Sequence, residues 1–394
     1  MKRYAPWRTK STGAVLALAL SKAHGWSPAL ISTRAVAYRY YSSAGSWGSD
    51  KVLRRDQPRG LGRGWRRTTV RMQVWSNPQA VQDYKDLLGG QAPEEKIDGP
   101  SVIVGKGRLG TALASMGMGE DVMLGRGEGI PEDIPGSSVG EGDDGGMLRE
   151  FPIYVCVPEN EVASVIDSCP PEKRDDLVFL QSGCMEPLLK SRGLCRNDQT
   201  QATLFFSVDK VGARPKEYLT NIGTDSRGEA KLAGETVACG KWKGALAMRL
   251  ERSAYNLRCA KVFYLDWRRL MFEKMIFECT VNLVGALHQR KTVGFITRYH
   301  AEEVGDMLFE LKNTLRGTLA VTLMNGYPER LLAYGDEVGD DRETGMDEFK
   351  FKWYNHFFYD ISEMGLQKGF GDPCPMHTEY LEYGREQGLF NFKV

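Results

Sequence analysis

Between about residues 101 and 264, the apolar residues gather in short β-branched runs separated by helical or glycine-rich stretches. These runs lie at 102–104, 121–124, 151–157 and 176–180, with further candidates at 203–208, 236–239 and 261–264. Short apolar runs predict buried strands, and the helical segments between them predict crossovers of a parallel sheet. Ligands bind at the carboxyl ends of such strands. We therefore expect a ligand site where these runs end.

The last third of the chain has a helical pattern instead. The predicted helices span 267–287, 302–325 and 349–366. The first is almost wholly apolar, which predicts burial, but Lys274, Glu278 and Asn282 interrupt it at a spacing of four and so share one stripe. Taken alone, Lys274 and Glu278 also fit a plain ion pair on a solvated helix face. The C-terminal region is expected to be all helical.

The first apolar run leads directly into a Gly-x-Gly-x-x-Gly loop, made of Gly105, Lys106, Gly107, Arg108, Leu109 and Gly110. Gly105 permits a tight turn, Gly107 lets the backbone approach a pyrophosphate, and Gly110 lets the next helix pack against the strand. The helix N-terminus supplies free N–H donors. With a strand before it and a helix after it, the motif predicts a dinucleotide site. The alternative is a glycine-rich loop without a ligand.

The end of the second run bears on which dinucleotide is bound. An acidic residue there binds the ribose of NAD, whereas a basic residue accommodates the 2′-phosphate of NADP. The run ends in Gly125-Arg126, and Glu128 follows two residues later. Arg126 favours NADP(H), although the side chain could equally be an ordinary solvated charge.

The N-terminus differs in composition from the rest of the chain. Residues 1–49 contain seven Lys and Arg but no Asp or Glu, although the whole chain is balanced at 52 basic and 51 acidic residues. This predicts an organelle presequence over 1–41, mitochondrial with a plastid as the alternative, and an Arg/Gly-rich linker over 42–97. Its apolar run at 14–20 is too short to span a bilayer. No membrane partner is expected.

The charge balance also argues against a nucleic-acid binder, since only the Arg-rich arm at 54–71 would support one. The eight cysteines contain no Cys-x-x-Cys, and the five histidines form no His-x-x-x-His or His-Glu-x-x-His pattern. We therefore expect neither a disulfide framework nor a metal site.

Three segments resemble the ketopantoate reductases (2-dehydropantoate 2-reductases). They are the glycine loop, the turn at 180–185 and the helix at 272–287, whose Lys and Asn spacing is similar to that of the family; a weaker likeness covers 353–356 and 371–375. The resemblance implies an α/β fold, with an N-terminal Rossmann-type dinucleotide-binding domain at 98–262 and an all-helical C-terminal domain at 263–394. It further implies NADP(H) as cofactor, a small 2-oxo acid as substrate, and a role in pantothenate biosynthesis, and it allows a homodimer.

Carried over by position, Lys274 is the general acid toward the ketone oxygen and Asn282 contacts the substrate. Glu278 and Ser182 stand at substrate-binding positions where the family has asparagines, and Lys350 stands where it has a glutamate, with Glu348 nearby. A carboxylate at Glu278 would repel an oxo acid unless it is paired with Lys274 or protonated.

Two hypotheses follow. The first is an NADPH-dependent reductase of a 2-oxo acid or related small ketone, with Lys274 as general acid. The alternative is a non-catalytic NADP(H)-binding protein that keeps the fold with an altered cleft.

Overall fold

The computed structural model describes residues 95–141, 147–194, 198–224, 230–289, 291–390 and 392. The predicted presequence at 1–41 and all but the last three residues of the predicted linker at 42–97 lie outside these ranges. The mitochondrial destination therefore stays a prediction.

Within the described ranges, one seven-stranded sheet has the order β13-β12-β7-β6-β5-β1-β2. The strands are β1 (Val102–Val104), β2 (Val122–Leu124), β5 (Ile153–Val155), β6 (Leu177–Phe179), β7 (Thr200–Thr203), β12 (Thr236–Cys239) and β13 (Cys259–Lys261). From β2 to β7 all neighbours are parallel, whereas β12 runs antiparallel to β7. Because β1 has β2 on one side and the later β5 on the other, the chain changes direction there, at the point where doubly wound sheets bind ligands.

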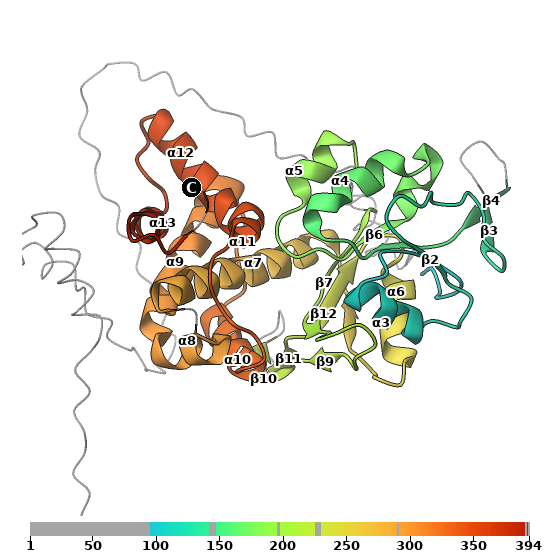
Figure 1. The fold of residues 1–394 in the computed structure, drawn as a ribbon, viewed down its shortest axis with the longest axis horizontal. Coiled ribbons are helices and arrows are strands. Elements are labelled where there is room, and N and C mark those ends of the chain that lie inside the picture. Colours follow the sequence, from blue (N-terminus) through green and yellow to red (C-terminus); the bar gives the residue numbers. More distant parts are fainter. Residues whose placement is uncertain are drawn as a thin grey trace, which may run out of the picture. The chain divides into compact units, whose positions relative to one another are not determined.

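Helices cover both faces of this sheet (Figure 1). Ile103, at the middle of β1, packs in one cluster with α3 (Arg108–Met116) and α6 (Lys243–Arg252). Its neighbour Val102 packs in another cluster with α4 (Glu159–Ser168) and α5 (Glu186–Ser191). This alternation follows from the two-residue period of a strand, and burial on both faces explains the continuous apolar runs.

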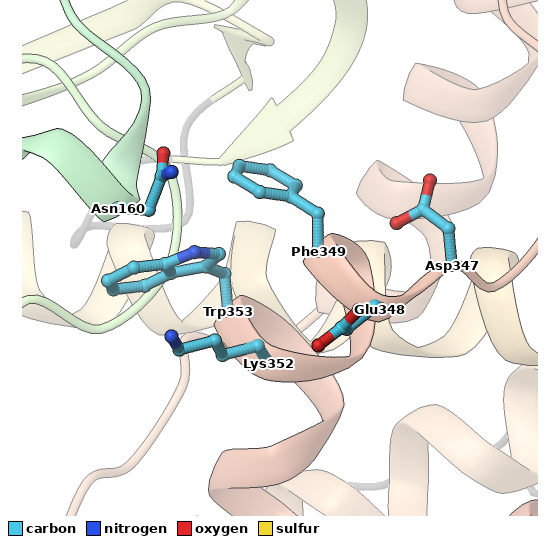
Figure 2. Close-up of a pocket in the computed structure, with 6 residues that line it drawn as sticks. All are labelled: Asn160, Asp347, Glu348, Phe349, Lys352 and Trp353. Carbon is cyan, nitrogen blue, oxygen red and sulfur yellow. The ribbon is translucent and has the colours of Figure 1, made fainter. Parts of the chain in front are cut away.

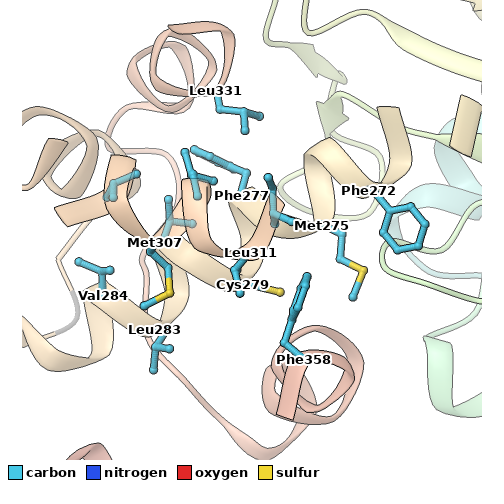
Figure 3. Close-up of a cluster of buried hydrophobic side chains, with 14 of the residues drawn as sticks. Phe272, Met275, Phe277, Cys279, Leu283, Val284, Met307, Leu311, Leu331 and Phe358 are labelled. Atoms are coloured by element: carbon cyan, nitrogen blue, oxygen red, sulfur yellow. The ribbon is translucent and has the colours of Figure 1, made fainter. Parts of the chain in front are cut away.

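The second region is helical, as expected. Its helices are α7 (Tyr264–Leu287), α8 (Val293–Tyr299), α9 (Ala301–Leu319), α10 (Tyr327–Val338), α11 (Glu348–Lys350), α12 (His356–Gln367) and α13 (Pro375–Glu386), with a π-helical turn, η3 (Phe351–Asn355), between α11 and α12. α7 runs from the sheet into the other helices (Figure 1). Figure 3 shows its side chains Phe272, Phe277 and Leu283 in a core shared with Met307 of α9 and Phe358 of α12. Among the described residues, no helix is long and apolar enough to cross a membrane.

The predicted elements differ from the structure in several places. The helix expected over 302–325 ends at Leu319, where Ala320 takes a left-handed conformation, and the helix expected over 349–366 is divided by η3. The run at 203–208 is only partly strand, since β7 ends at Thr203 and β8 (Phe206–Ser207) pairs with β9 (Lys216–Glu217). Two more hairpins, β3 (Ser138–Glu141) with β4 (Met147–Glu150) and β10 (Thr220–Thr224) with β11 (Ala230–Ala233), were not expected. Short two-stranded pairings of this kind depend on packing more than on local sequence.

Candidate functional site

The glycine loop joins β1 to α3, and a side chain would clash at two of its three glycines. Gly105 has φ of +114°, and a Cβ on it would lie 2.6 Å from the carbonyl oxygen of Cys156, after β5. A Cβ on Gly110 would lie 1.8 Å from the oxygen of Gly105. In contrast, a Cβ on Gly107 would meet no atom within 4 Å. The close contacts of the loop therefore exclude a side chain at Gly105 and Gly110, whereas a side chain at Gly107 would project into open space.

The N-terminus of α3 is open in the same way. Its N-cap is Gly107, which makes no side-chain capping bond, and the first turn carries no acidic side chain. Backbone N–H groups at a helix start attract anions, and here no side chain of this helix competes for them. The loop and the helix start therefore fit the pyrophosphate of a dinucleotide. The side chain of Arg108 lies nearby, 3.4 Å from the carbonyl of Asp209, and Leu109 packs on the sheet.

The charged residues after β2 are already engaged with neighbours. Arg126 pairs with Glu161, in the first turn of α4. The carboxylate of Glu128 accepts a 2.7 Å bond from the backbone N–H of Gly125 and lies 3.3 Å from the Lys106 ammonium. These two contacts, the backbone bond first, hold the pKa of Glu128 below its usual range. Both side chains stand at the carboxyl end of β2, where a dinucleotide ribose would lie.

Lys274 is buried, with only 8% of its surface exposed. Its Nζ donates to the carbonyl oxygen of Leu204, the residue after β7, and lies 4.7 Å from the centre of the Phe205 ring. α7 therefore brings an ammonium group to the carboxyl edge of the sheet. Burial lowers the pKa of Lys274 to about 8, with the opposing attraction of Glu278 too weak to restore the usual value.

Glu278 lies one turn further along α7 and is 4% exposed. Its Oε1 accepts a 2.8 Å bond from Nη1 of Arg342, in the loop after α10, so the bonded partner of this carboxylate is an arginine and not Lys274. Burial would raise the pKa of the Glu278 carboxyl, but Arg342 and Lys274 outweigh it and lower the pKa below its ordinary value. The carboxylate is thus ionised, and the solvated surface pair considered from the sequence is wrong for Lys274 and Glu278.

Asn282 completes the stripe and is also buried. Its Nδ2 donates to the backbone oxygen of Glu278 at 2.8 Å, and its Oδ1 accepts a 2.9 Å bond from the ammonium of Lys350 in α11. The Glu278 carboxylate therefore lies near three cations, Lys274, Arg342 and Lys350. In addition, Nη2 of Arg342 is buried and has no hydrogen-bond partner among the described residues. This guanidinium donor is therefore available to water or to an anionic group.

Ser182 follows β6 and reaches the same region through η3. The Tyr354 hydroxyl hydrogen-bonds with Ser182 and lies close enough to Glu278 to feel its charge; burial, more than these charges, raises the pKa of Tyr354. The backbone N–H of Ser182 bonds the carboxylate of Glu159, at the start of α4. A Cβ on Gly183 would lie 2.7 Å from the oxygen of Trp353, so the turn after β6 and η3 make close backbone contact.

A cavity of about 440 Å³ lies beside this contact. Its lining consists of Asn160, Asp347, Glu348, Phe349, Lys352 and Trp353 (Figure 2). Figure 2 shows Asn160 of α4 facing the rings of Trp353 and Phe349, which come from η3 and α11. This opening lies beside α4, and neither the stripe of α7 nor the glycine loop contributes to its lining.

The structure therefore brings together Lys274, Glu278 and Asn282, and links them to Ser182 through Tyr354. The glycine loop lies beside the end of β5, because Gly105 is close to Cys156. Sequence reasoning missed Arg342 and Tyr354. Arg342 lies in a charged loop with no period, so no signal in the sequence sets it apart from its neighbours.

No protein-family model and no curated protein matches this sequence. Solved structures with a similar backbone include a ternary structure of D-mandelate dehydrogenase with NADH and anilino(oxo)acetate, at 14% identity and a TM-score of 0.44, covering 74% of this chain and 99% of that chain. A ketopantoate reductase from Ralstonia eutropha is similar at 15% identity and a TM-score of 0.46, over 73% and 97% of the two chains. The 2-dehydropantoate 2-reductase from Methylococcus capsulatus is similar at 12% and 0.46, over 75% and 99%. Because these identities and TM-scores are low, the assignment of the fold depends on the strand order of the sheet. Any function must be inferred from the residues of the site.

Proposed function

We propose that this protein is an NADP(H)-dependent oxidoreductase that reduces a 2-oxo acid or a related small ketone. The observation that carries the proposal is Lys274, an ammonium group of lowered pKa, buried at the carboxyl edge of a sheet with a dinucleotide-type glycine loop. The loop and the start of α3 would hold the pyrophosphate, and Arg126 supplies the positive charge that a 2′-phosphate requires. The bound nicotinamide would supply the hydride.

Lys274 serves as the general acid. Negative charge develops on the carbonyl oxygen as a ketone is reduced, and an adjacent ammonium stabilises that charge and donates its proton. Its pKa of about 8 lies near physiological pH, which suits proton transfer in both directions. Arg342 and Lys350 would hold the substrate carboxylate, since together they exceed the single negative charge of Glu278.

The alternative, a non-catalytic NADP(H)-binding protein, has one observation in its favour. Arg342 already bonds Glu278, and Lys350 already bonds Asn282. A substrate carboxylate would therefore compete with these side chains for the two cations. The two candidate functions share the cofactor site and differ in turnover.

A turnover assay separates them. The full chain is mixed with NADPH and a panel of 2-oxo acids that includes ketopantoate, and loss of reduced nicotinamide is followed by absorbance. We expect turnover that falls about 100-fold or more in Lys274→Met, the scale of general acid catalysis. Lys368→Met, at an exposed position after α12, is the matched control and should keep full activity.

Cofactor binding is tested separately with Gly107→Val. No atom lies within 4 Å of a Cβ at this position, so the variant should fold with an unchanged melting temperature while NADPH fluorescence enhancement is lost. NADPH binding without turnover on any substrate would favour the non-catalytic alternative. No binding by the wild-type chain would refute both.

A further inference from the structure

Two histidines and a glutamate converge where α7 ends and α9 begins, outside the polar stripe of Lys274, Glu278 and Asn282. Nε2 of His288, the C-cap of α7, lies 2.9 Å from Oε2 of Glu303 in the first turn of α9. Nδ1 of His300, which joins α8 to α9, lies 3.4 Å from the same oxygen. The three side chains are 13–21% exposed, so the cluster is largely removed from water.

We propose that His288, His300 and Glu303 bind a divalent transition-metal ion such as Zn²⁺, with water completing the coordination. Their ligand atoms all lie within 4.8 Å of one another. Two ligands at zinc-bond length in a tetrahedral site stand roughly 3.3 Å apart, and the separations of 2.9 and 3.4 Å bracket that value. Two imidazoles and one carboxylate are a donor set that zinc and iron(II) both use.

The state of the side chains suits a cation. The two imidazole rings stack with their centroids 3.7 Å apart, an arrangement that disfavours charge on both. Burial, followed by the proximity of His288, lowers the pKa of His300. Burial would raise the pKa of Glu303, but the hydrogen bond and charge of His288 lower it overall. An imidazole nitrogen that carries no proton and an ionised carboxylate are the forms that bind a metal ion.

The surroundings fix these ligands. The backbone N–H of His288 bonds the oxygen of Val284, and that of His300 bonds Ile296, which holds both residues against their helices. The hydroxyl of Tyr380, on α13, hydrogen-bonds the Glu303 carboxylate from outside, as outer partners of metal-ligating carboxylates do. The spacing of these residues, 288, 300 and 303, matches neither His-x-x-x-His nor His-Glu-x-x-His, so the sequence shows no such zinc motif.

A metal here would clamp the chain between α7 and α9. The segment in between begins α8, where the N–H of Val293 donates to the backbone oxygen of Arg342 at 2.9 Å. Arg342 is the residue that pairs with Glu278, so the clamp and the polar stripe share a structural support. The metal is a structural element in this proposal and takes no part in the reduction.

The test uses the full chain, stripped with a chelator and titrated with Zn²⁺ against a chromophoric competitor. We expect one tight equivalent per chain, a rise in melting temperature on binding, and weaker binding as the pH falls through the histidine range. Glu303→Gln and His288→Ala should each lose that equivalent and the rise in melting temperature. Glu303→Gln keeps the shape of the side chain, so its circular dichroism should match that of the wild type.

His356→Ala is the matched control, because His356 pairs with Asp360 on an exposed surface of α12 and should not affect binding. A tight site that survives in both Glu303→Gln and His288→Ala lies elsewhere, for example at the cysteines, and would overturn the proposal. So would the absence of any Zn²⁺ binding stronger than that of the Glu303→Gln variant.

Discussion

Replacing Lys274 with methionine should stabilise the folded protein at neutral pH while removing the proposed reductase activity. Burial lowers the pKa of this ammonium from an ordinary 10.5 to about 8. At about 1.4 kcal/mol per pKa unit, the charged form costs the folded state about 3 kcal/mol. Methionine fills a similar volume without charge, but it leaves the carbonyl of Leu204 without its donor, which costs about 1 kcal/mol. The net gain at pH 7 is about 2 kcal/mol.

The pH dependence distinguishes this charge effect from simple repacking. A lysine with a lowered folded pKa binds fewer protons in the folded state than in the unfolded state between pH 8 and 10.5. Wild-type stability therefore rises through this window, relative to the variant, because the unfolded chain binds the extra proton. The cost is fully present below pH 8 and disappears toward pH 10.5, so the advantage of Lys274→Met should fall to about zero near pH 10.

Chemical denaturation of both proteins at pH 7 and pH 10 measures the two differences, with Lys368→Met as an exposed control that should show neither. A variant less stable than the wild type at pH 7 would refute the reasoning. A difference that is the same at both pH values would also refute it, because it would not come from the charge.

Two further predictions concern the other charged groups. Arg342→Met leaves the buried Glu278 carboxylate without its bonded cation and should lower stability by about 2 kcal/mol in thermal unfolding, less than for a fully buried pair because 37% of the Arg342 side chain is exposed. Arg298→Met, which breaks an exposed pair, should cost less than about 1 kcal/mol. Equal losses of stability in the two variants would show that the Arg342–Glu278 pair contributes no more than an exposed ion pair. Glu161→Gln frees Arg126 and should raise the affinity for NADPH relative to NADH, while Arg126→Ala should lower it, as measured by fluorescence titration. A ratio that neither variant changes would exclude Arg126 as the residue that selects the cofactor.

Local patterns predicted the parts of this fold that depend on local physics. The β-branched run at 102–104 becomes β1, the glycine loop starts α3 at Arg108, and the apolar stretch at 267–287 lies within α7. In each case the local sequence either restricts the backbone directly or is apolar on every side, so it favours one secondary structure over the alternatives.

Other features depend on contacts between distant segments. No proline interrupts the stretch at 349–366, yet η3 divides it where the backbone of Trp353 meets the turn at Gly183. Similarly, β12 is as fully buried as the parallel strands of the sheet, but its pairing with β7 is antiparallel. The bond from Arg342 to Glu278 joins residues 64 positions apart. Periodicity carries no information on such pairings.

The arrangement of charge in the stripe supports a functional rather than a structural origin. If Glu278 existed only to neutralise Lys274, the two would form a direct ion pair, and the arginine would be unnecessary. Instead Arg342 bonds Glu278, and the Lys274 ammonium bonds a backbone carbonyl and keeps a pKa of about 8. A buried amine left without a bonded carboxylate destabilises the fold, and such residues persist mainly where chemistry needs them. The Glu278–Arg342 pair thus fixes the electrostatic surroundings of Lys274 and leaves its ammonium without a bonded carboxylate, as the proposed proton transfer requires.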